Sequence, residues 1–273
     1  MTRFRDNLPA PVRRPLSSVY WWWRNRGQHR LAAAFSPLPG RSARRLAEMR
    51  DIHKGERCFI LGNGPSLRRN DLRRLRHENT FGMNRIYLAF GEMGFPTTYY
   101  VSVNTLVLEQ CSDEIRQLAL PKFITWRGRK WFRGDPGAIF LDTDYTGPPT
   151  FSRDVRGRVF EGSTVTYVAL QLAFHLGFED VILIGVDHNF EQKGPANATI
   201  VSAGEDKDHF DPSYFGRGFR WQLPDLEASE QAYRLARQAF ESAGRRVLDA
   251  TVGGRLTVFP KVDYDSLFRR TRT

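Results

Sequence analysis

Residues 163–187 read STVTYVALQLAFHLGFEDVILIGVD, and this stretch indicates the fold class more clearly than any other part of the chain. Apolar side chains recur at helical spacing from Val165 to Leu176, and Gly177 suits the left-handed residue that ends many helices. A continuously apolar run follows at once, which is typical of a strand covered on both faces. The stretch therefore predicts a buried helix that leads directly into a central strand.

Strand-like and helix-like runs alternate along the rest of the chain. The predicted strands are residues 57–61, 80–84, 98–103, 122–126, 138–141, 180–187 and 245–251, and the predicted helices are residues 66–76, 105–120, 163–178 and 226–244. Alternation of this kind predicts an α/β fold of modified Rossmann-like type, in which a mostly parallel sheet carries helices on both faces.

Positive charge is concentrated near the N-terminus of the 273-residue chain, whose formal net charge is +11. Residues 1–50 contain eleven arginines against Asp6 and Glu48, a surplus of +9, so that only +2 is left for residues 51–273. We therefore expect a basic Trp/Arg-rich arm over residues 1–50 and one catalytic domain over residues 51–273.

Three adjacent tryptophans, Trp21 to Trp23, lie among arginines within residues 13–30. Indole rings favour the headgroup region of a bilayer and arginines favour anionic lipid, so the arm is predicted to touch a membrane surface. No apolar run approaches the roughly 20 residues needed to span a bilayer. A solvated tail or a packing arm is the alternative, and contact with another polyanion is a third reading, although a nucleic-acid partner is not expected.

The two cysteines, Cys58 and Cys111, lie in a predicted strand and a predicted helix. They do not resemble a disulfide framework, and a reducing cytoplasm is the simpler expectation. Because the chain contains neither CxxC nor HExxH, a structural zinc site is not expected.

Residues 188–224 lose all periodicity and are rich in Gly, Pro, charged and aromatic residues. A connection of more than about 15 residues without regular structure is usually functional or disordered, and the aromatic residues argue against disorder. We predict that this segment is a lid or an acceptor-binding insertion over the carboxyl ends of the strands.

The stretch RCFILGNGPSL, residues 57–67, breaks an apolar strand into a glycine turn. Gly62 and Gly64 allow a sharp turn with room for a ligand, Pro65 suits the first position of a helix, and Ser66 adds a hydroxyl. Free N–H groups there would suit a phosphate. A third glycine and a GxxxxGK[ST] pattern are both missing, which disfavours NAD and a P-loop; a tight turn without a ligand is the alternative.

Further polar residues lie where strands end or helices begin. Asn84, Asn104 and Asp187 end predicted strands, and Gly162, Ser163 and Thr164 open the buried helix. The carboxyl ends of parallel strands are where ligands bind, so these residues favour a site at that edge. Each also has a structural explanation, since Asn and Thr cap helices and a strand-end Asp often holds a loop.

Several of these motifs together resemble a known superfamily. FILGNGPSL, FGMNRIY, SVN, the Gly-Ser-Thr helix start and VILIGVD, followed by a His-rich aromatic loop, are similar to the bacterial CMP-sialic acid transferases that decorate lipooligosaccharide. They also resemble the motility-associated flagellin glycosyltransferases and the 6-hydroxymethylpterin diphosphokinase MptE-like proteins. The resemblance extends from about Arg57 to Phe268.

The resemblance implies a set of functional residues. The general base would be His209, with His188 beside Asp187 as its rival, because an imidazole of ordinary pKa suits the proton of an attacking hydroxyl. By the resemblance, the substrate- and nucleotide-binding residues would be Gly62, Asn63, Gly64, Pro65, Ser66, Asn84, Asn104, Ser163 and Thr164. We predict that Gly162, Asp187, His188 and Tyr214 belong to the same site.

One departure concerns the departing phosphate. The sialyltransferases place two tyrosines shortly after the strand-end Asp, whereas this chain has none before Tyr214. Lys193, Tyr214, Arg217 or Arg220 are candidate substitutes, and the donor is either another CMP-linked acidic sugar or not a CMP-sugar.

The predicted function is transfer of an acidic sugar from a CMP-activated donor to a glycan or lipid-linked acceptor at the inner face of a bacterial membrane, with no metal ion required. One alternative is a pterin diphosphokinase that uses ATP and Mg²⁺, with Asp187 and either Asp142 or Asp144 as metal ligands. The other is a nucleotide-sugar-binding module without catalysis.

Overall fold

The structure is a computed structural model that describes residues 37–146 and 150–269. Contacts divide the chain into two units, residues 1–44 and 45–273. The predicted membrane segment, residues 13–30, lies outside the described residues, and the division into an arm and a catalytic domain at residue 51 stays a prediction. Helix α3 (Pro37–Glu48) begins within the segment treated as an arm and was not predicted. No helix in the described ranges is long and apolar enough to cross a membrane.

The second unit contains an eight-stranded sheet in the order β10-β7-β1-β2-β3-β4-β5-β6, and all neighbouring strands are parallel. The strands are β1 (Arg57–Leu61), β2 (Asn79–Met83), β3 (Tyr99–Ser102), β4 (Lys122–Thr125), β5 (Ala138–Asp144), β6 (Arg158–Phe160), β7 (Asp180–Ile184) and β10 (Arg246–Asp249). The α/β, modified Rossmann-like prediction is confirmed, and only the three-residue β6 was missed among these strands.

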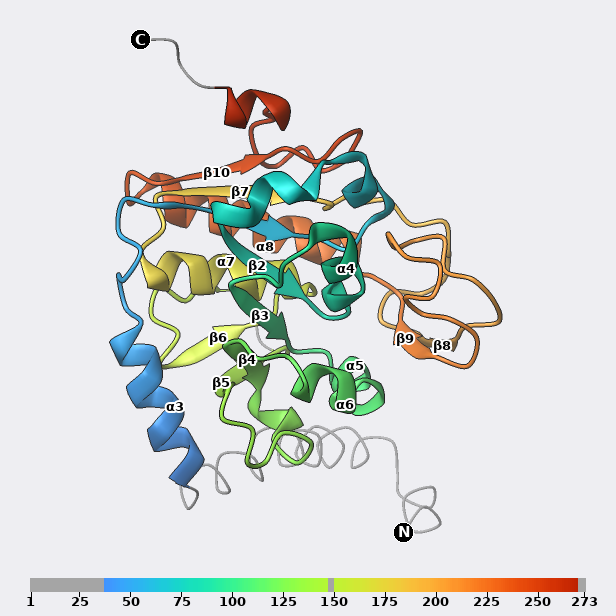
Figure 1. The fold of residues 1–273 in the computed structure, drawn as a ribbon, viewed down its shortest axis with the longest axis horizontal. Helices are drawn as coiled ribbons and strands as arrows, with labels where there is room; N and C mark the ends of the chain where they lie inside the picture. The colour runs from blue at the N-terminus through green and yellow to red at the C-terminus, as the bar shows by residue number, and fades with distance from the viewer. Residues whose placement is uncertain (1–36, 147–149, 270–273) are drawn as a thin grey trace, which may run out of the picture. The chain divides into compact units, whose positions relative to one another are not determined.

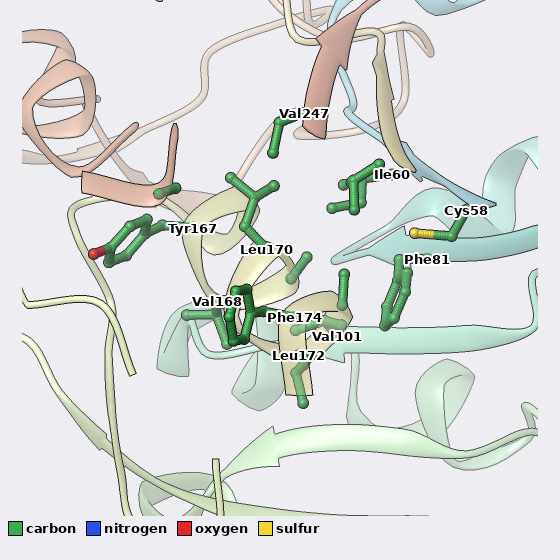
Figure 2. Packing of buried hydrophobic residues seen from close by; sticks show 14 of the residues in the cluster. Cys58, Ile60, Phe81, Val101, Tyr167, Val168, Leu170, Leu172, Phe174 and Val247 are labelled. Carbon is green, nitrogen blue, oxygen red and sulfur yellow. The ribbon is translucent and has the colours of Figure 1, made fainter. Parts of the chain in front are cut away.

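Helices α7 (Val165–Leu176) and α8 (Leu226–Glu241) lie on one face of the sheet, and α4 (Phe90–Met93) lies on the other (Figure 1). All but the first of the α7 residues are buried, as its apolar pattern predicts. They pack against Cys58, Ile60, Phe81 and Val101 of the strands (Figure 2). Gly177 ends the helix at φ +98°, in the left-handed region.

Two predicted helices differ in the structure. The predicted helix at 66–76 consists of two 3₁₀ helices, η2 (Pro65–Arg69) and η3 (Leu72–His77), because Asn70 is extended and the Asp71 side chain caps the second one. The predicted helix at 105–120 divides at Cys111 into α5 (Thr105–Gln110) and α6 (Ser112–Arg116). Shorter 3₁₀ turns are η4 (Ile86–Ala89), η5 (Trp126–Gly128) and η6 (Asp265–Phe268).

The insertion at residues 188–224 contains regular structure that its sequence did not indicate. β8 (Thr199–Val201) and β9 (Arg220–Gln222) form an antiparallel ribbon. Figure 1 shows this insertion, in amber and orange, beyond the end of the sheet toward which the arrow of β2 points. Its role as a lid stays a prediction.

The strand order reverses between β1 and β7. From β1 the chain proceeds to β2 and outward to β6, and it then returns through α7 to β7 on the other side of β1. In open parallel sheets this reversal is the point at which ligands bind, outside the carboxyl ends of the strands. The glycine turn after β1 and the loop after β7 therefore meet where a site is expected.

Candidate functional site

The glycine turn after β1 is packed against the loop after β7. The amide of Gly64 donates to the carbonyl of Gly185 at 2.9 Å. A Cβ atom on Gly62 would lie 2.2 Å from that same carbonyl oxygen, and one on Gly64 would lie 1.9 Å from Oδ2 of Asp187. Any larger residue at position 62 or 64 would collide with protein atoms. The room predicted for a ligand at these positions is filled by Gly185 and Asp187.

Asp187 is bonded to the turn that was predicted to hold phosphate. Its carboxylate accepts from the Ser66 amide at 3.1 Å and from the Ser66 hydroxyl at 2.7 Å. Burial raises the pKa of Asp187, and the bonds from Ser66 lower it by less. Because η2 is a five-residue 3₁₀ helix and the Ser66 amide is already used, the prediction of a phosphate at the start of an α-helix is not supported by this geometry.

Asn63, between the two glycines, is the polar residue of the turn that the protein leaves unsatisfied. Its Oδ1 atom is buried and accepts from no other described residue. A buried acceptor without a partner costs about 1–3 kcal/mol, which a ligand that donates a hydrogen bond would offset. The Asn63 carbonyl accepts from the amide of Phe210 at 2.8 Å, so the turn is also joined to the insertion.

Asn84 and Asn104 are each fixed through the side-chain oxygen. Asn84, at φ +50°, accepts from the Ser102 hydroxyl at 2.9 Å. Asn104 caps α5 by accepting from the amide of Leu106 at 2.9 Å, as the structural explanation predicted. Neither amide nitrogen donates to a residue within the described ranges, so both side chains are held in place with an unused donor, and their role in binding stays a prediction.

The two residues before the N-cap of α7 have left-handed backbone conformations, and the first of them has no room for a side chain. Gly162 and Ser163 have φ of +54° and +58°, and a Cβ on Gly162 would lie 2.4 Å from the Tyr167 ring. Thr164 caps the helix through the Thr166 amide and lies 3.4 Å from the Tyr233 hydroxyl. Ser163 is exposed, and its hydroxyl bonds to nothing in the described part of the chain.

His209 forms a pair with Asp206 within the insertion. Nδ1 of His209 lies 2.8 Å from Oδ2 of Asp206, whose carboxylate also accepts from the amides of Asp208, His209 and Phe215. The Asp206 side chain is 4% exposed. A carboxylate held by so many donors fixes the imidazole so that Nδ1 carries the proton, and Nε2, which bonds to no described residue, is left as the acceptor.

An aromatic cage surrounds His209. Tyr214 stacks on its ring with centroids 4.1 Å apart and planes 3° apart, and Phe215, Trp221 and Phe190 contact it edge-on. His188, the rival base, is 8% exposed in its side chain, and its Nε2 lies 3.1 Å from Oε1 of Glu230. Nε2 of His209 therefore bonds to no described residue, whereas Nε2 of His188 is hydrogen-bonded to Glu230.

Arg85, which the sequence did not single out, joins the insertion to the sheet. It is 8% exposed, and its guanidinium donates to the carbonyls of Ser213 (2.8 Å) and Tyr214. Its amide lies 3.3 Å from the Tyr214 hydroxyl, and its charge lies over the Phe219 ring at 4.7 Å. Nothing in the sequence around Arg85 indicates that it is buried, because the groups that bind its guanidinium lie far along the chain.

The candidate phosphate-holding residues are differently placed. Tyr214 is buried under His209, and burial raises its pKa. Arg220 pairs with Glu109 at 2.9 Å, and Lys193 donates to the Phe190 carbonyl at 2.6 Å. Arg217 is exposed and bonds to no described residue. Tyr214 thus packs beneath His209. Among the four candidates for holding the departing phosphate, Arg217 is the one cation without a partner among the described residues.

The magnesium ligands proposed for the diphosphokinase alternative do not come together. Asp187 follows β7, whereas Asp142 and Asp144 lie in β5, five strand positions away in the sheet. At about 4.8 Å per strand this is roughly 24 Å. In the described ranges, no three His, Cys, Asp or Glu side chains gather closely enough to hold a metal ion. Dependence of the reaction on a metal ion stays untested.

An eight-stranded parallel sheet with helices around it and a reversal of strand order defines a Rossmann-like α/β protein. The chain belongs to the family described as 6-hydroxymethylpterin diphosphokinase MptE-like, which matches residues 39–193. It is similar in structure to the MAf glycosyltransferase from Magnetospirillum magneticum AMB-1, with a TM-score of 0.50 and 14% identity. The match covers 85% of this chain and 39% of that one, and at this identity it bears on the fold alone. No curated protein matches the chain.

Proposed function

We propose that the protein is a glycosyltransferase that moves an acidic sugar from a CMP-activated donor to a glycan or lipid-linked acceptor. The observation that supports it best is the Asp206–His209 pair beside the switch point of the sheet. The residue after His209 is hydrogen-bonded to Asn63 in the glycine turn, which keeps a base and a nucleotide-binding loop within one assembly.

In the proposed reaction, Nε2 of His209 accepts the proton of the acceptor hydroxyl as its oxygen bonds to the anomeric carbon. The bond from that carbon to the phosphate oxygen breaks, and CMP leaves with the electron pair. Asp206 stabilises the imidazolium through Nδ1. The amide nitrogens of Asn84 and Asn104 and the unsatisfied Oδ1 of Asn63 offer donors and an acceptor to the nucleotide.

The transfer is proposed to need no metal ion and to take place at the cytoplasmic face of the membrane. The family description favours a second candidate, a pterin diphosphokinase that uses ATP and Mg²⁺. That candidate requires metal ligands other than the Asp142, Asp144 and Asp187 set, because those carboxylates lie on distant strands.

The first test is isothermal titration of the full chain with CMP, CDP, UDP, GDP and ATP, each with Mg²⁺ and with EDTA. Selective binding of CMP or CDP that persists in EDTA is expected. Tight binding of ATP only with Mg²⁺ would favour the diphosphokinase, and binding of CMP-sugars without turnover would favour a binding module.

The second test compares His209→Ala with His188→Ala in transfer from a CMP-sugar found to bind. His209→Ala should lower kcat by about 10²–10⁴-fold, the usual contribution of a general base, with little change in nucleotide affinity. His188→Ala should retain most activity. The opposite ranking would assign the base to His188.

A further inference from the structure

The two 3₁₀ helices that follow the glycine turn form a strongly basic surface. Residues 65–77 contain five arginines and one aspartate, which leaves +4. Since residues 51–273 together carry +2, the remainder of that segment has a net charge of −2. The net excess of positive charge in residues 51–273 therefore lies in residues 65–77.

Helix geometry turns Arg73 and Arg76 outward together. A 3₁₀ helix has three residues per turn, so residues three apart share a face. In η3, Leu72 and Leu75 are buried at 3% and 0% exposure, while Arg73 and Arg76 are exposed along one side. The arginine face is our name for the five arginines of η2 and η3, of which Arg74 is half-buried and the others are exposed: Arg68, Arg69, Arg73, Arg74 and Arg76.

The charge of the arginine face is only partly neutralised within the protein. Arg68 lies 3.6 Å from Asp211, Arg73 pairs with Asp71 at 2.9 Å, and Arg74 pairs with Asp265 at 2.5 Å. Arg69 and Arg76 donate only to backbone carbonyls, those of Val252 and Gly94, among the contacts of the described residues. A guanidinium has five N–H donors, so an arginine that is paired with one carboxylate or bonded to one carbonyl can still contact a second anion.

The aromatic rings beside the arginine face are already covered. Arg74 lies over the Phe268 ring at 4.4 Å, and Phe59 stacks on that ring with planes 11° apart. Arg76 lies over Phe95 at 5.2 Å. Single-stranded nucleic acid would need free rings on which to stack its bases, whereas a lipid surface requires only charge.

We propose that the arginine face docks the protein on an anionic phospholipid bilayer. The contact is independent of the proposed sugar transfer and of the Trp-bearing residues 13–30. Arg68 lies 3.6 Å from Asp211, two residues after His209, so docking would bring the insertion close to the lipid headgroups.

The test is binding of the full chain to vesicles of phosphatidylcholine with phosphatidylglycerol and to vesicles of phosphatidylcholine alone. The triple variant Arg69→Gln/Arg73→Gln/Arg76→Gln should bind the anionic vesicles roughly 100-fold more weakly, at about fivefold per arginine near a charged surface. Lys130→Gln/Arg133→Gln/Arg153→Gln removes the same charge from exposed positions outside the arginine face and should bind within about twofold of the natural chain.

Both triple variants are also measured in full chains that carry Trp21→Ser, Trp22→Ser and Trp23→Ser, so that these tryptophans cannot mask the effect. Equal vesicle binding by the two triple variants would overturn the proposal. So would tighter binding of a single-stranded RNA oligonucleotide than of anionic vesicles at equal phosphate concentration, which would assign the face to nucleic acid.

Discussion

Gly64 and Asp187 lie so close together that a methyl group added at residue 64 would displace the Asp187 carboxylate. Gly64 has φ −70°, which any residue adopts, so the glycine is needed for space and not for conformation. The space is taken by the Asp187 carboxylate, 1.9 Å from where a Cβ would lie. Any enlargement of residue 64 is therefore coupled to the position of Asp187.

Gly64→Ala should lower the free energy of unfolding by about 1–3 kcal/mol, because a methyl group overpacks the contact with Asp187. The measurement is urea denaturation. Gly91→Ala is the matched control, since nothing lies within 4 Å of its Cβ position, and it should change stability little. Removing the obstacle in Gly64→Ala/Asp187→Ala should recover part of the loss; equal losses in Gly64→Ala and Gly91→Ala would contradict the contact.

Asp206→Asn tests the orientation of His209. An amide presents N–H groups where Asp206 now accepts from Nδ1 and from the Phe215 amide, so the imidazole should lose its fixed tautomer. We expect kcat to fall by at least about 10²-fold with KM nearly unchanged. Asp208→Asn is the control, because that carboxylate accepts only from the Glu191 and Gln192 amides. Similar kcat values in both variants would show that the pair is structural.

At the scale of elements, the insertion is attached to the rest of the domain by hydrogen bonds and ion pairs. Arg85 bonds to the carbonyls of Ser213 and Tyr214, and Gln110 of α5 bonds to both backbone groups of Arg220. The Phe210–Asn63 bond and the contacts of Asp211 with Arg68, Arg220 with Glu109 and His188 with Glu230 also attach it. All of these partners lie in loops or helices and not within strands of the sheet, so the insertion can loosen without loss of the sheet.

Arg85→Met should loosen the insertion because it leaves two carbonyls without their buried donor. Such a group costs about 1–3 kcal/mol, so local opening should rise by roughly tenfold or more. The measurement is the rate of trypsin cleavage at the exposed Lys207 and Arg217. Arg116→Met, which removes one bond to the Trp131 carbonyl, is the control. Unchanged cleavage in Arg85→Met would mean that Arg85 does not hold the segment.

The long apolar elements could be predicted from the sequence because their pattern is local. Seven strands of the sheet, α7 and α8 lie where their periodicity indicated. β6, β8 and β9 have three residues each, which is too few to show a period. The sequence of η2 and η3 predicts one α-helix because the three-residue repeat of a 3₁₀ helix is close to the α-helical repeat of 3.6 residues.

The site was less predictable because its geometry depends on distant partners. The sequence indicated small residues at Gly62 and Gly64 but not that Gly185 and Asp187 fill the space beside them. Arg85 reads as a surface cation, yet its partners come from 128 and 129 residues further along the chain. Asp206 lies three residues before His209, but only the fold of the insertion turns it toward Nδ1.

At the scale of the whole molecule, a buried histidine links helix α3 to α7. Nε2 of His175 lies 2.8 Å from the Leu46 carbonyl, its side chain is fully buried, and Nδ1 has no partner closer than Asp154 at 3.6 Å. Burial is the main cause that lowers the pKa of His175, and the charges of Arg50 and Arg156 act in the same direction. The hydrogen bond to the Leu46 carbonyl and the charge of Asp154 oppose them.

Stability should therefore depend on pH through His175. A histidine whose folded pKa lies below its unfolded value of about 6.5 favours the unfolded state as pH falls through that value, by at most about 1.4 kcal/mol per pH unit. His175→Gln retains a donor for Leu46 but does not titrate. The stability of the natural chain relative to this variant should fall between pH 7.5 and 5.5 in urea denaturation. A constant difference would exclude His175 as the cause.

The adjacency of β1 and β7 has a consequence for the newly made chain. β1 and β7 pair along their full length, yet about 120 residues separate them in the sequence. At about 5–20 residues per second, a ribosome needs roughly 6 to 24 s to pass from one to the other. During that interval the edge of β1 that will pair with β7 has no neighbour, so the middle of the sheet stays open until β7 is made, and a chaperone would have most to protect there.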